Sequence, residues 1–236
     1  MKMLILAGGF GKRLRGAVND VPKPMAPING TPLLNLQIEH WIRQGQHSFV
    51  FLLHHQADVI IDFLVAKTEE LGGLVSITWI VEETPLGTGG SVSHAIHHNN
   101  LTGDVLISNA DTWLDGGLQQ LSSSRGAAIA VTHTKDTSRY GSILLDENSF
   151  LTKFIEKTMV LGNDKSGIIN AGLYKLPTSI FPWENGKKFS LETEILPQMA
   201  SKKLLKAEML NGMFFDIGIP EDYYKFCDWY QANEKK

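Results

Sequence analysis

A glycine-rich segment with two cations at its far end follows the first apolar run of the chain. Gly8, Gly9 and Gly11 are succeeded at once by Lys12 and Arg13. Glycines let the backbone pass close to an anion and point N–H groups at it, and arginine offers phosphate oxygens a fixed fork of donors. The segment therefore predicts phosphate binding, although a tight strand-to-helix turn is an alternative for the glycines alone. Its spacing is neither Gly-x-Gly-x-x-Gly nor Gly-x-x-x-x-Gly-Lys-Ser/Thr, which disfavours a dinucleotide fold and a Walker ATPase.

A lysine held between two prolines comes next in the chain. Pro22 and Pro24 stiffen the backbone around Lys23, which suits a positive charge kept at a fixed place against a phosphate. Together the two segments resemble the sugar-1-phosphate nucleotidyltransferases, whose signature is a glycine-rich loop ending in Arg-Leu and then a Pro-Lys-Pro segment. The resemblance extends over nearly the whole chain and implies catalytic roles for Arg13 and Lys23. It places the nucleotide against Leu6, Ala7, Gly8, Gly9, Gly11 and Lys12.

A second glycine-rich segment, residues 82–90, ends the third predicted strand and enters a helix. In the family that the chain resembles, this segment lies against the nucleotide base, where glycines permit close approach. The resemblance implies nucleotide contacts for Glu82, Gly87 and Thr88, and for Asn109 at the end of the fourth predicted strand. A plain loop with a helix N-cap is the alternative for the segment.

Two aspartates match the metal-binding carboxylates of the same family. Asp111 follows the fourth predicted strand, and ligands of open α/β sheets sit outside the carboxyl ends of strands. Asp216 lies far along the chain, between Phe215 and Ile217. Two carboxylates together with substrate phosphate oxygens suit Mg²⁺, which rarely takes an all-protein cage. The resemblance therefore implies Mg²⁺ as cofactor, whereas a lone aspartate is often only a cap or turn residue.

Segments of the second half resemble the family's sugar-phosphate site. The resemblance implies that Glu156 and Asn170 hold sugar hydroxyls, that Lys157 faces the sugar's phosphate, and that the Gly141 backbone contacts the sugar ring. Glu192 lies in a segment that recurs in the family, but its role stays open, and a helix cap by Ser190 is at least as plausible.

The histidines and the single cysteine point away from a zinc site. His94, His97 and His98 have helical spacing, but a solvated polar helix face explains them better than zinc does. Cys227 is the only cysteine, so an intramolecular disulfide and a Cys-based zinc site are excluded.

The fold must hold the residues above in place, and it is indicated by apolar runs that alternate with helical patterns. Such alternation predicts an α/β fold: a Rossmann-like, mainly parallel sheet flanked by helices. Four near-continuous apolar runs read as strands covered on both faces: residues 3–7, 48–54, 75–81 and 105–108.

The second half has fewer helical patterns and predicts a smaller mixed β extension. A fifth strand, at residues 127–132, is followed by short β-like stretches at residues 142–145, 151–156, 168–176 and 204–209. Helices are expected near residues 192–200 and from Pro220, where acidic residues favour the positive end of the dipole. No composition shift marks a linker, so we expect one nucleotidyltransferase domain over residues 1–236.

Composition restricts the class of partner. The chain has 236 residues, 22 basic and 25 acidic, with a formal net charge of −3. This near-neutral balance disfavours nucleic-acid or anionic-membrane binding driven by bulk charge. No run approaches the ~20 apolar residues of a membrane span, and glycines interrupt the first apolar run before a signal-peptide core develops. We therefore expect a cytoplasmic protein with small-molecule partners.

The resemblance implies transfer of a nucleotide from a nucleoside triphosphate to a sugar 1-phosphate, with release of pyrophosphate. Residues 21–30 and 86–90 look most like the guanylyltransferases that act on D-glycero-D-manno-heptose 1-phosphate in bacterial surface-polysaccharide pathways. That implies GTP and a manno-configured sugar. One departure is Lys12, where the family usually has threonine, and it places one triphosphate contact in question.

Other readings stay open on the sequence alone. Mannose or another hexose 1-phosphate could be the acceptor, and UTP, CTP or dTTP the donor, because loops read both base and sugar. A non-catalytic nucleotide-sugar sensor on the same fold is disfavoured by the two aspartates together with Arg13 and Lys23. A nicotinamide-dependent oxidoreductase is disfavoured by the glycine spacing. The sequence indicates no oligomeric state.

Overall fold

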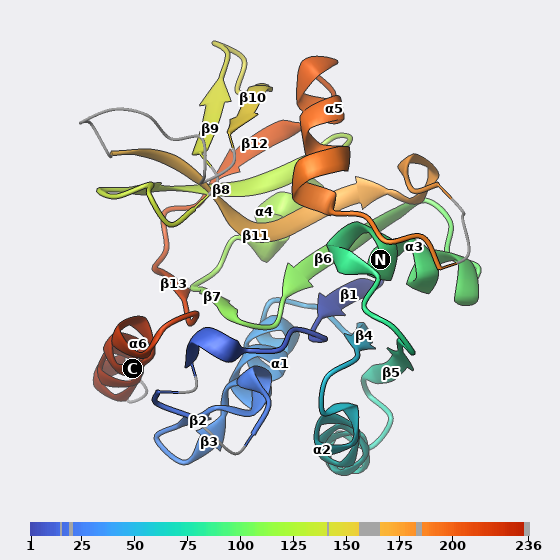
Figure 1. The fold of residues 1–236 in the computed structure, drawn as a ribbon, viewed down its shortest axis with the longest axis vertical. Helices are drawn as coiled ribbons and strands as arrows, with labels where there is room; N and C mark the ends of the chain where they lie inside the picture. Colours follow the sequence, from blue (N-terminus) through green and yellow to red (C-terminus); the bar gives the residue numbers. More distant parts are fainter. Residues whose placement is uncertain (15, 19–20, 141, 156–165, 183–185, 234–236) are drawn as a thin grey trace.

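The computed structural model describes residues 1–14, 16–18, 21–140, 142–155, 166–182 and 186–233. Within these ranges nine strands form one sheet, whose main order is β10-β9-β11-β6-β1-β4-β5 (Figure 1). The mainly parallel, helix-flanked sheet with a smaller mixed extension that the sequence predicts is confirmed.

Four strands make up the parallel half of the sheet: β1 (Met3–Leu6), β4 (Ser48–Leu53), β5 (Ser76–Val81) and β6 (Asp104–Asn109). Leu4 of β1 lies between Val50 of β4 and Ile107 of β6 in a parallel register. The predicted strands are confirmed to within about two residues. β5 differs in its burial, because it lies at the sheet's edge and exposes Ser76 and Thr78 while burying Ile77.

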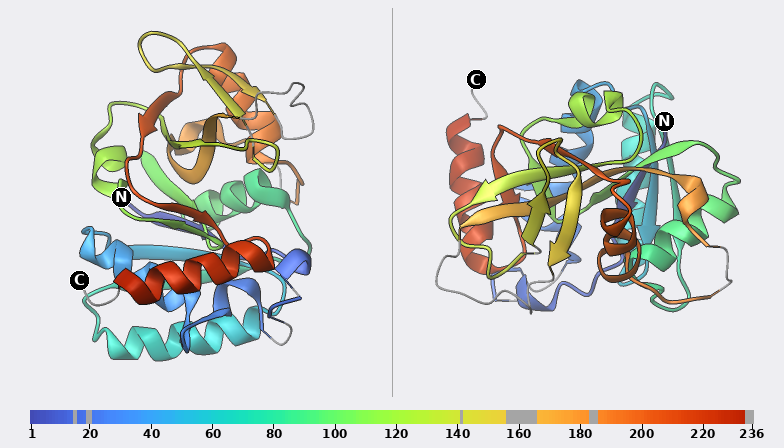
Figure 2. Two further views of the ribbon diagram at one scale, coloured as in Figure 1. Left: turned by 90° about the vertical axis from the view of Figure 1, so that its left-hand side faces the viewer. Right: turned by 90° about the horizontal axis from the view of Figure 1, so that it is seen from above.

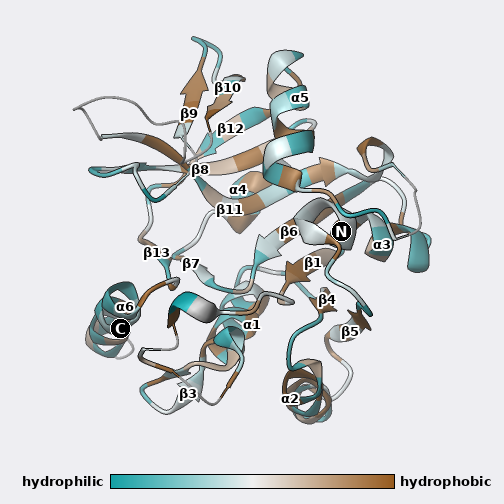
Figure 3. Ribbon diagram, in the orientation of Figure 1, coloured by the Kyte–Doolittle hydropathy of each residue, from teal (hydrophilic) through white to brown (hydrophobic). Residues whose placement is uncertain are grey.

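Helices cover the two faces of the sheet because its side chains alternate. Met3 and Ile5 of β1 face one core with α1 (Leu33–Arg43), α2 (Ala57–Glu70) and α4 (Leu118–Ser123). Leu4 faces the opposite core with α3 (Gly87–His98) and α5 (Leu196–Ser201). Figure 3 shows the hydrophobic character concentrated on the strands, with β1 and much of β11 in brown.

The extension continues the same sheet. Its strands are β8 (Ala128–Thr134), β9 (Ser142–Leu145), β10 (Leu151–Ile155), β11 (Gly167–Pro177) and β12 (Lys206–Met209). β11 joins the two halves, because it pairs antiparallel with both β6 and β8. β12 pairs parallel with β8, so the extension is mixed. The helix expected near residues 192–200 is a π-helical turn, Leu191–Ile195, followed by α5.

Short elements surround the carboxyl edge of the parallel strands. β7 (Thr112–Leu114) pairs antiparallel with β13 (Phe214–Asp216), and β2 (Pro27–Ile28) pairs with β3 (Thr31–Pro32). Short 3-10 helices occupy Lys12–Leu14 and Lys23–Met25, and a third, Thr178–Ile180, lies at the opposite edge, where Pro177 pairs with Asp104 at the start of β6.

The last helix, α6 (Pro220–Asn233), starts at the predicted proline. Phe226 and Tyr223 on α6 pack in a third core beside Trp113 and Ile28, and Figure 2 shows α6, in red, alongside the blue N-terminal segments. Cys227 lies half-buried next to this core, and burial raises the pKa of its thiol, as suits an unactivated cysteine. None of the helices in the described ranges has the length and apolar character to cross a membrane.

Candidate active site

Two adjoining cavities open at the carboxyl ends of β1 and β6. The larger, of about 560 Å³, is lined by Leu6 at the end of β1 and Asn109 at the end of β6. The smaller, of about 370 Å³, is lined by residues of the glycine-rich loop and by Lys23. Arg13 and Asp111 line both cavities, so the two spaces meet at these side chains.

The glycine-rich loop needs its glycines for two different reasons. A side-chain carbon at Gly8 would come within 3.2 Å of His54. Gly11 has a φ of +60, and a carbon added there would come within 3.2 Å of Lys23. Gly9 differs, because an added carbon there would meet no described atom within 4 Å, and its backbone lines both cavities. The loop therefore leaves a bare backbone surface that suits an anion. Arg13 is exposed at the end of this surface.

Most of the predicted nucleotide contacts of this loop lie at the cavities. Leu6 and Gly9 line both, Gly8 lines the larger, and Ala7 and Gly11 line the smaller. Lys12 begins a short helix by its backbone, and its side chain falls outside what the structure describes.

Lys23 reaches from its proline-flanked turn to the end of β6. Its Nζ atom donates to Oδ2 of Asp111 at 2.5 Å, and only 10% of the lysine side chain is exposed. Pro22 precedes the turn in an extended conformation, and Pro24 lies inside its first positions. The stiffened lysine expected from the sequence therefore holds its charge at a fixed point in the site.

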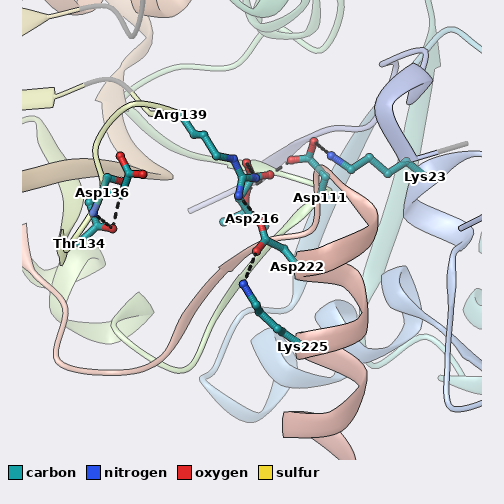
Figure 4. A network of polar contacts seen from close by, with 9 residues as sticks. Lys23, Asp111, Thr134, Asp136, Arg139, Asp216, Asp222 and Lys225 are labelled. Carbon is teal, nitrogen blue, oxygen red and sulfur yellow. Dashed lines mark hydrogen bonds and ion pairs between the residues drawn. The ribbon is translucent and has the colours of Figure 1, made fainter. Parts of the chain in front are cut away.

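The pairing of β7 with β13 brings the two predicted metal-binding aspartates together. Asp216 lies opposite Thr112 in the register, and the Ile217 N–H donates to the Asp111 carbonyl at 2.9 Å. Burial, followed by the negative charge of Asp111, raises the pKa of the Asp216 carboxyl. Figure 4 shows both carboxylates together with the side chains that face them.

The two carboxylates fit a Mg²⁺ site completed by substrate oxygens. A raised pKa caused partly by a neighbouring carboxylate marks two like charges that a divalent cation would offset. No group of three or more histidine, cysteine or acidic residues suited to a metal occurs among the described residues, which include His94, His97 and His98. Mg²⁺ is commonly bound by one or two carboxylates together with substrate phosphate oxygens, and this pair of aspartates suits that arrangement.

The segment at residues 82–90 is fixed by one hydrogen bond within itself and by others to residues 191–192. The buried Glu82 carboxylate accepts from the Leu86 N–H at 3.0 Å. Thr88 accepts from the Leu191 N–H at 2.9 Å and donates to Oε2 of Glu192 at 2.5 Å. Glu82, Gly87, Thr88 and Glu192 all line the larger cavity.

The next two glycines of that segment serve packing. A side-chain carbon at Gly89 would come within 2.4 Å of the Phe189 ring, and one at Gly90 within 2.6 Å of the Lys187 carbonyl. The N–H groups of both glycines point at the Phe189 carbonyl, at 3.1 and 3.2 Å. These glycines thus allow α3 to meet the segment before the π-helical turn.

Ser190 and Glu192 make hydrogen bonds at the start of the π-helical turn. Ser190 caps the following turn by accepting from the Thr193 N–H at 3.2 Å, so the cap expected at Ser190 is present. Glu192 also accepts from Ser190 and Thr88, and it lines the cavity. Glu192 therefore lies both beside the cap and at the cavity wall.

Asn170 is held rigidly at the wall formed by β11. Its side chain donates to the Tyr174 hydroxyl at 2.6 Å and accepts from the Gly172 N–H at 2.9 Å. Gly172 has a φ of +74, and an added carbon would come within 2.7 Å of Asn109, so the two strands meet closely here. The other predicted sugar-phosphate residues, Gly141, Glu156 and Lys157, lie outside the described residues.

Sequence reasoning missed several residues of the larger cavity, among them Arg139 and Phe10. Arg139, from the loop between β8 and β9, forms ion pairs with Asp222 at 2.5 Å and with Asp216 at 3.8 Å. Its only signal in the sequence was its place two positions before Gly141. Phe10 lines both cavities with 46% of its surface exposed and packs edge-to-face on His54.

An open α/β sheet with a bare glycine loop, cations and two carboxylates at the carboxyl ends of its strands defines an enzyme acting on phosphorylated small molecules. Residues 2–233 match the family model described as "Nucleotidyl transferase", and the chain belongs to this family. The family expected from the loop and the Pro-Lys-Pro segment is thus confirmed, and an oxidoreductase is excluded.

Individual proteins of the family with similar sequences or structures give a finer comparison than the family model does. The chain is 35% identical over 228 residues to the D-glycero-alpha-D-manno-heptose 1-phosphate guanylyltransferase of Campylobacter jejuni, covering 96% of this chain and 98% of the relative. It is 36% identical over 233 residues to a probable mannose-1-phosphate guanylyltransferase of Oryza sativa, covering 94% of this chain but only 63% of that relative's length. Among solved structures, HddC from Yersinia pseudotuberculosis complexed with GMP-PN has a TM-score of 0.81 at 33% identity, covering 97% of this chain and 99% of HddC.

Proposed function

We propose that this chain is a sugar-1-phosphate guanylyltransferase that joins GMP from GTP to D-glycero-D-manno-heptose 1-phosphate and releases pyrophosphate. The observation that carries the proposal is the meeting of Lys23, Asp111 and Asp216 beside the bare Gly9 backbone. Names of relatives support the base and the sugar: HddC is complexed with a guanine nucleotide, and the Campylobacter relative is named for the heptose phosphate.

The proposed reaction needs positioning more than covalent help. An oxygen of the sugar phosphate attacks the α-phosphorus of GTP, and the bond from that phosphorus to the oxygen bridging the β-phosphate breaks. The bridging oxygen leaves with pyrophosphate. The attacking phosphate is already an anion, so no general base is required.

The proposed role of each side chain follows from the cavity that it lines. Arg13 and the Gly9 backbone face the junction of the cavities and neutralise the departing pyrophosphate. Lys23, in the smaller cavity, holds its charge against phosphates at the reacting centre. Asn170 orients sugar hydroxyls from the opposite wall, with an amide already fixed by Tyr174 and Gly172.

Asp111 and Asp216 would hold the proposed Mg²⁺. Bound there, Mg²⁺ supplies charge neutralisation for the reacting phosphates. Asp111 lies in the turn between β6 and β7, and Asp216 ends β13, so the pairing of β7 with β13 sets their spacing. The product would serve as a surface-polysaccharide precursor made in the cytoplasm.

Mannose 1-phosphate is the second candidate acceptor. Its support is the Oryza relative, which matches this chain at 36% identity and is named as probably acting on that sugar phosphate. Because the chain spans 63% of that relative, the similarity covers only part of the plant protein.

A pyrophosphate-release assay across GTP, ATP, UTP, CTP and dTTP and a panel of sugar 1-phosphates tests the proposal. We expect GTP with the heptose phosphate to give the highest kcat/KM, because a pocket built to hydrogen-bond guanine leaves polar groups unpaired with adenine. Asp111→Asn serves as the inactive control. A preference for another nucleotide or for glucose 1-phosphate would refute the guanylyltransferase assignment and leave the family unaffected.

A further inference from the structure

Arg139 reaches across the larger cavity from the extension toward the metal-binding aspartates. It comes from the loop between β8 and β9, whereas its partners Asp216 and Asp222 belong to β13 and the start of α6 (Figure 4). Nη1 lies 2.5 Å from Asp222, and Nη2 lies 3.8 Å from Asp216. The short contact anchors the guanidinium, and the long one leaves Asp216 without a close cation from this side.

One donor of this guanidinium is unused. Nη2 is buried and has no hydrogen-bond partner among the described residues, and 3.8 Å to Asp216 exceeds hydrogen-bond range. A buried donor without a partner costs free energy, so an acceptor that forms a hydrogen bond with it recovers more binding free energy than usual. A third of the Arg139 side chain is exposed and the residue lines the larger cavity, so a turn of the guanidinium would bring Nη2 to an anion there.

The cations of the site divide between the two cavities. Lys23 lines the smaller cavity, Arg139 lines the larger, and Arg13 lines both. The larger cavity also contains the Asn170 wall, where the proposed function places the sugar. A cation in that cavity therefore lies on the side from which the sugar 1-phosphate would enter.

Building on the proposed function, we propose that Arg139 binds the phosphate of the sugar 1-phosphate, and that in the ligand-free protein it instead balances the charge of Asp216. The arginine suits both tasks, because its fork can hold Asp222 with one nitrogen and a phosphate oxygen with another. Asp222 then acts as the anchor that keeps the guanidinium in reach of either anion.

The two states compete, so Arg139 should weaken the binding of a divalent cation to the ligand-free protein. When Asp216 holds a divalent cation, Arg139 is repelled from it, so the arginine opposes metal binding until a phosphate accepts its charge. Removing the charge should then favour metal binding to the ligand-free protein. A typical active-site arginine that merely supported the carboxylate would have the opposite effect.

Binding of Mn²⁺ to the ligand-free protein, measured by calorimetry, tests this sign. We expect Arg139→Gln to tighten Mn²⁺ binding by about tenfold, the effect of removing one positive charge some 6 Å from a divalent cation in a water-like medium. Arg139→Lys keeps the charge and should bind Mn²⁺ like the wild type. Arg125→Gln, an exposed arginine between α4 and β8, is the matched control and should change nothing. Weaker Mn²⁺ binding by Arg139→Gln would overturn the competition.

Steady-state kinetics test the phosphate contact. Arg139→Gln should raise KM for the sugar 1-phosphate by about tenfold or more, while KM for GTP changes little. An unchanged KM for the sugar phosphate would refute the contact. As a further arm, inorganic phosphate should tighten Mn²⁺ binding in the wild type more than in Arg139→Gln, and equal tightening in both would also refute it.

The binding measurements and the turnover assays distinguish a wrong role for Arg139 from a wrong proposed function. If no sugar 1-phosphate reacts with any nucleotide, the proposed function fails, but the Mn²⁺ and inorganic phosphate measurements still judge Arg139. If turnover follows the proposed function and those measurements show no effect of Arg139→Gln, only this inference fails.

Discussion

Gln37 on α1 should control the position of the turn that carries Asp111 without touching substrate. The side chain is 1% exposed, and its Nε2 donates to the Thr112 carbonyl at 2.7 Å and to the Asn109 carbonyl at 3.5 Å. These two carbonyls flank Asp111. Gln37→Leu keeps most of the volume and removes the donor, so the turn loses its support from the helix below.

The size of the effect follows from the hydrogen bonds. A buried carbonyl left without its donor costs about 1–3 kcal/mol in the free energy of unfolding. Gln37 Oε1 is itself buried without a partner among the described residues, and removing it offsets part of that cost. We therefore expect a net loss of about 1 kcal/mol in stability. Displacement of Asp111 should lower kcat more severely, by about tenfold to a hundredfold.

Gln46→Leu is the matched control. Gln46 is also buried, at 7% exposure, and donates to the Ser48 and Met1 carbonyls at 2.6 and 3.2 Å, at the other end of β1 from the cavities. Urea unfolding should show a comparable loss of stability in both variants. Only Gln37→Leu should lower kcat and raise the Mg²⁺ concentration needed for half-maximal pyrophosphate release. Wild-type kcat and Mg²⁺ dependence in a destabilised Gln37→Leu protein would refute the reasoning.

Further predictions concern the carboxylates, the cations and the packing of α3. Asp111→Asn and Asp216→Asn should each abolish most pyrophosphate release, and chelation should do the same to the wild type. Burial and the Asp111 charge raise the pKa of Asp216, so its carboxyl favours folding while protonated and opposes it once pH rises through that raised value. Asp216→Asn should therefore raise the metal-free melting temperature at neutral pH, and the gain should vanish on acidification below the ordinary aspartate range. Arg13→Ala and Lys23→Ala should lower kcat more than they raise KM, since contacts made only in the transition state act on kcat; a pure KM effect would contradict this. Gly90→Ala should lower the free energy of unfolding by about 1–3 kcal/mol in a urea titration, because its new carbon would meet a backbone carbonyl at 2.6 Å.

The parallel half of the sheet was predictable because its strands are long and apolar. β1, β4 and β6 are buried along nearly their whole length, and such runs bounded by turn residues leave little choice of element. β7 and β13 were not predicted, because strands of three residues each show no periodicity. Their pairing nevertheless sets Asp216 opposite Thr112. The sequence could connect Asp111 with Asp216, the two predicted metal ligands, only through a family resemblance.

Contacts between distant segments explain the other limits. The sequence suggested that glycines at residues 87–90 allow close approach to a base, whereas Gly89 and Gly90 meet residues 187–191 in the structure. The hydroxyl of Thr88 is likewise taken up by Glu192 and Leu191. A glycine in a sequence indicates that another group approaches the backbone closely, but it does not identify whether that group is a ligand or a distant part of the chain. The roles assigned to individual site residues remain predictions for the experiments above.

The negative charge of the site is balanced by cations that come from different segments of the chain. Folding brings Asp111 and Asp216 together, and the raised pKa of Asp216 records the cost. Lys23 and Arg139 offset that charge from two different segments, so the balance exists only in the complete fold. Entry of a divalent cation with phosphates preserves the balance, because positive and negative charges arrive together. Entry of the cation alone does not. The site should therefore bind metal and nucleotide together more readily than metal alone.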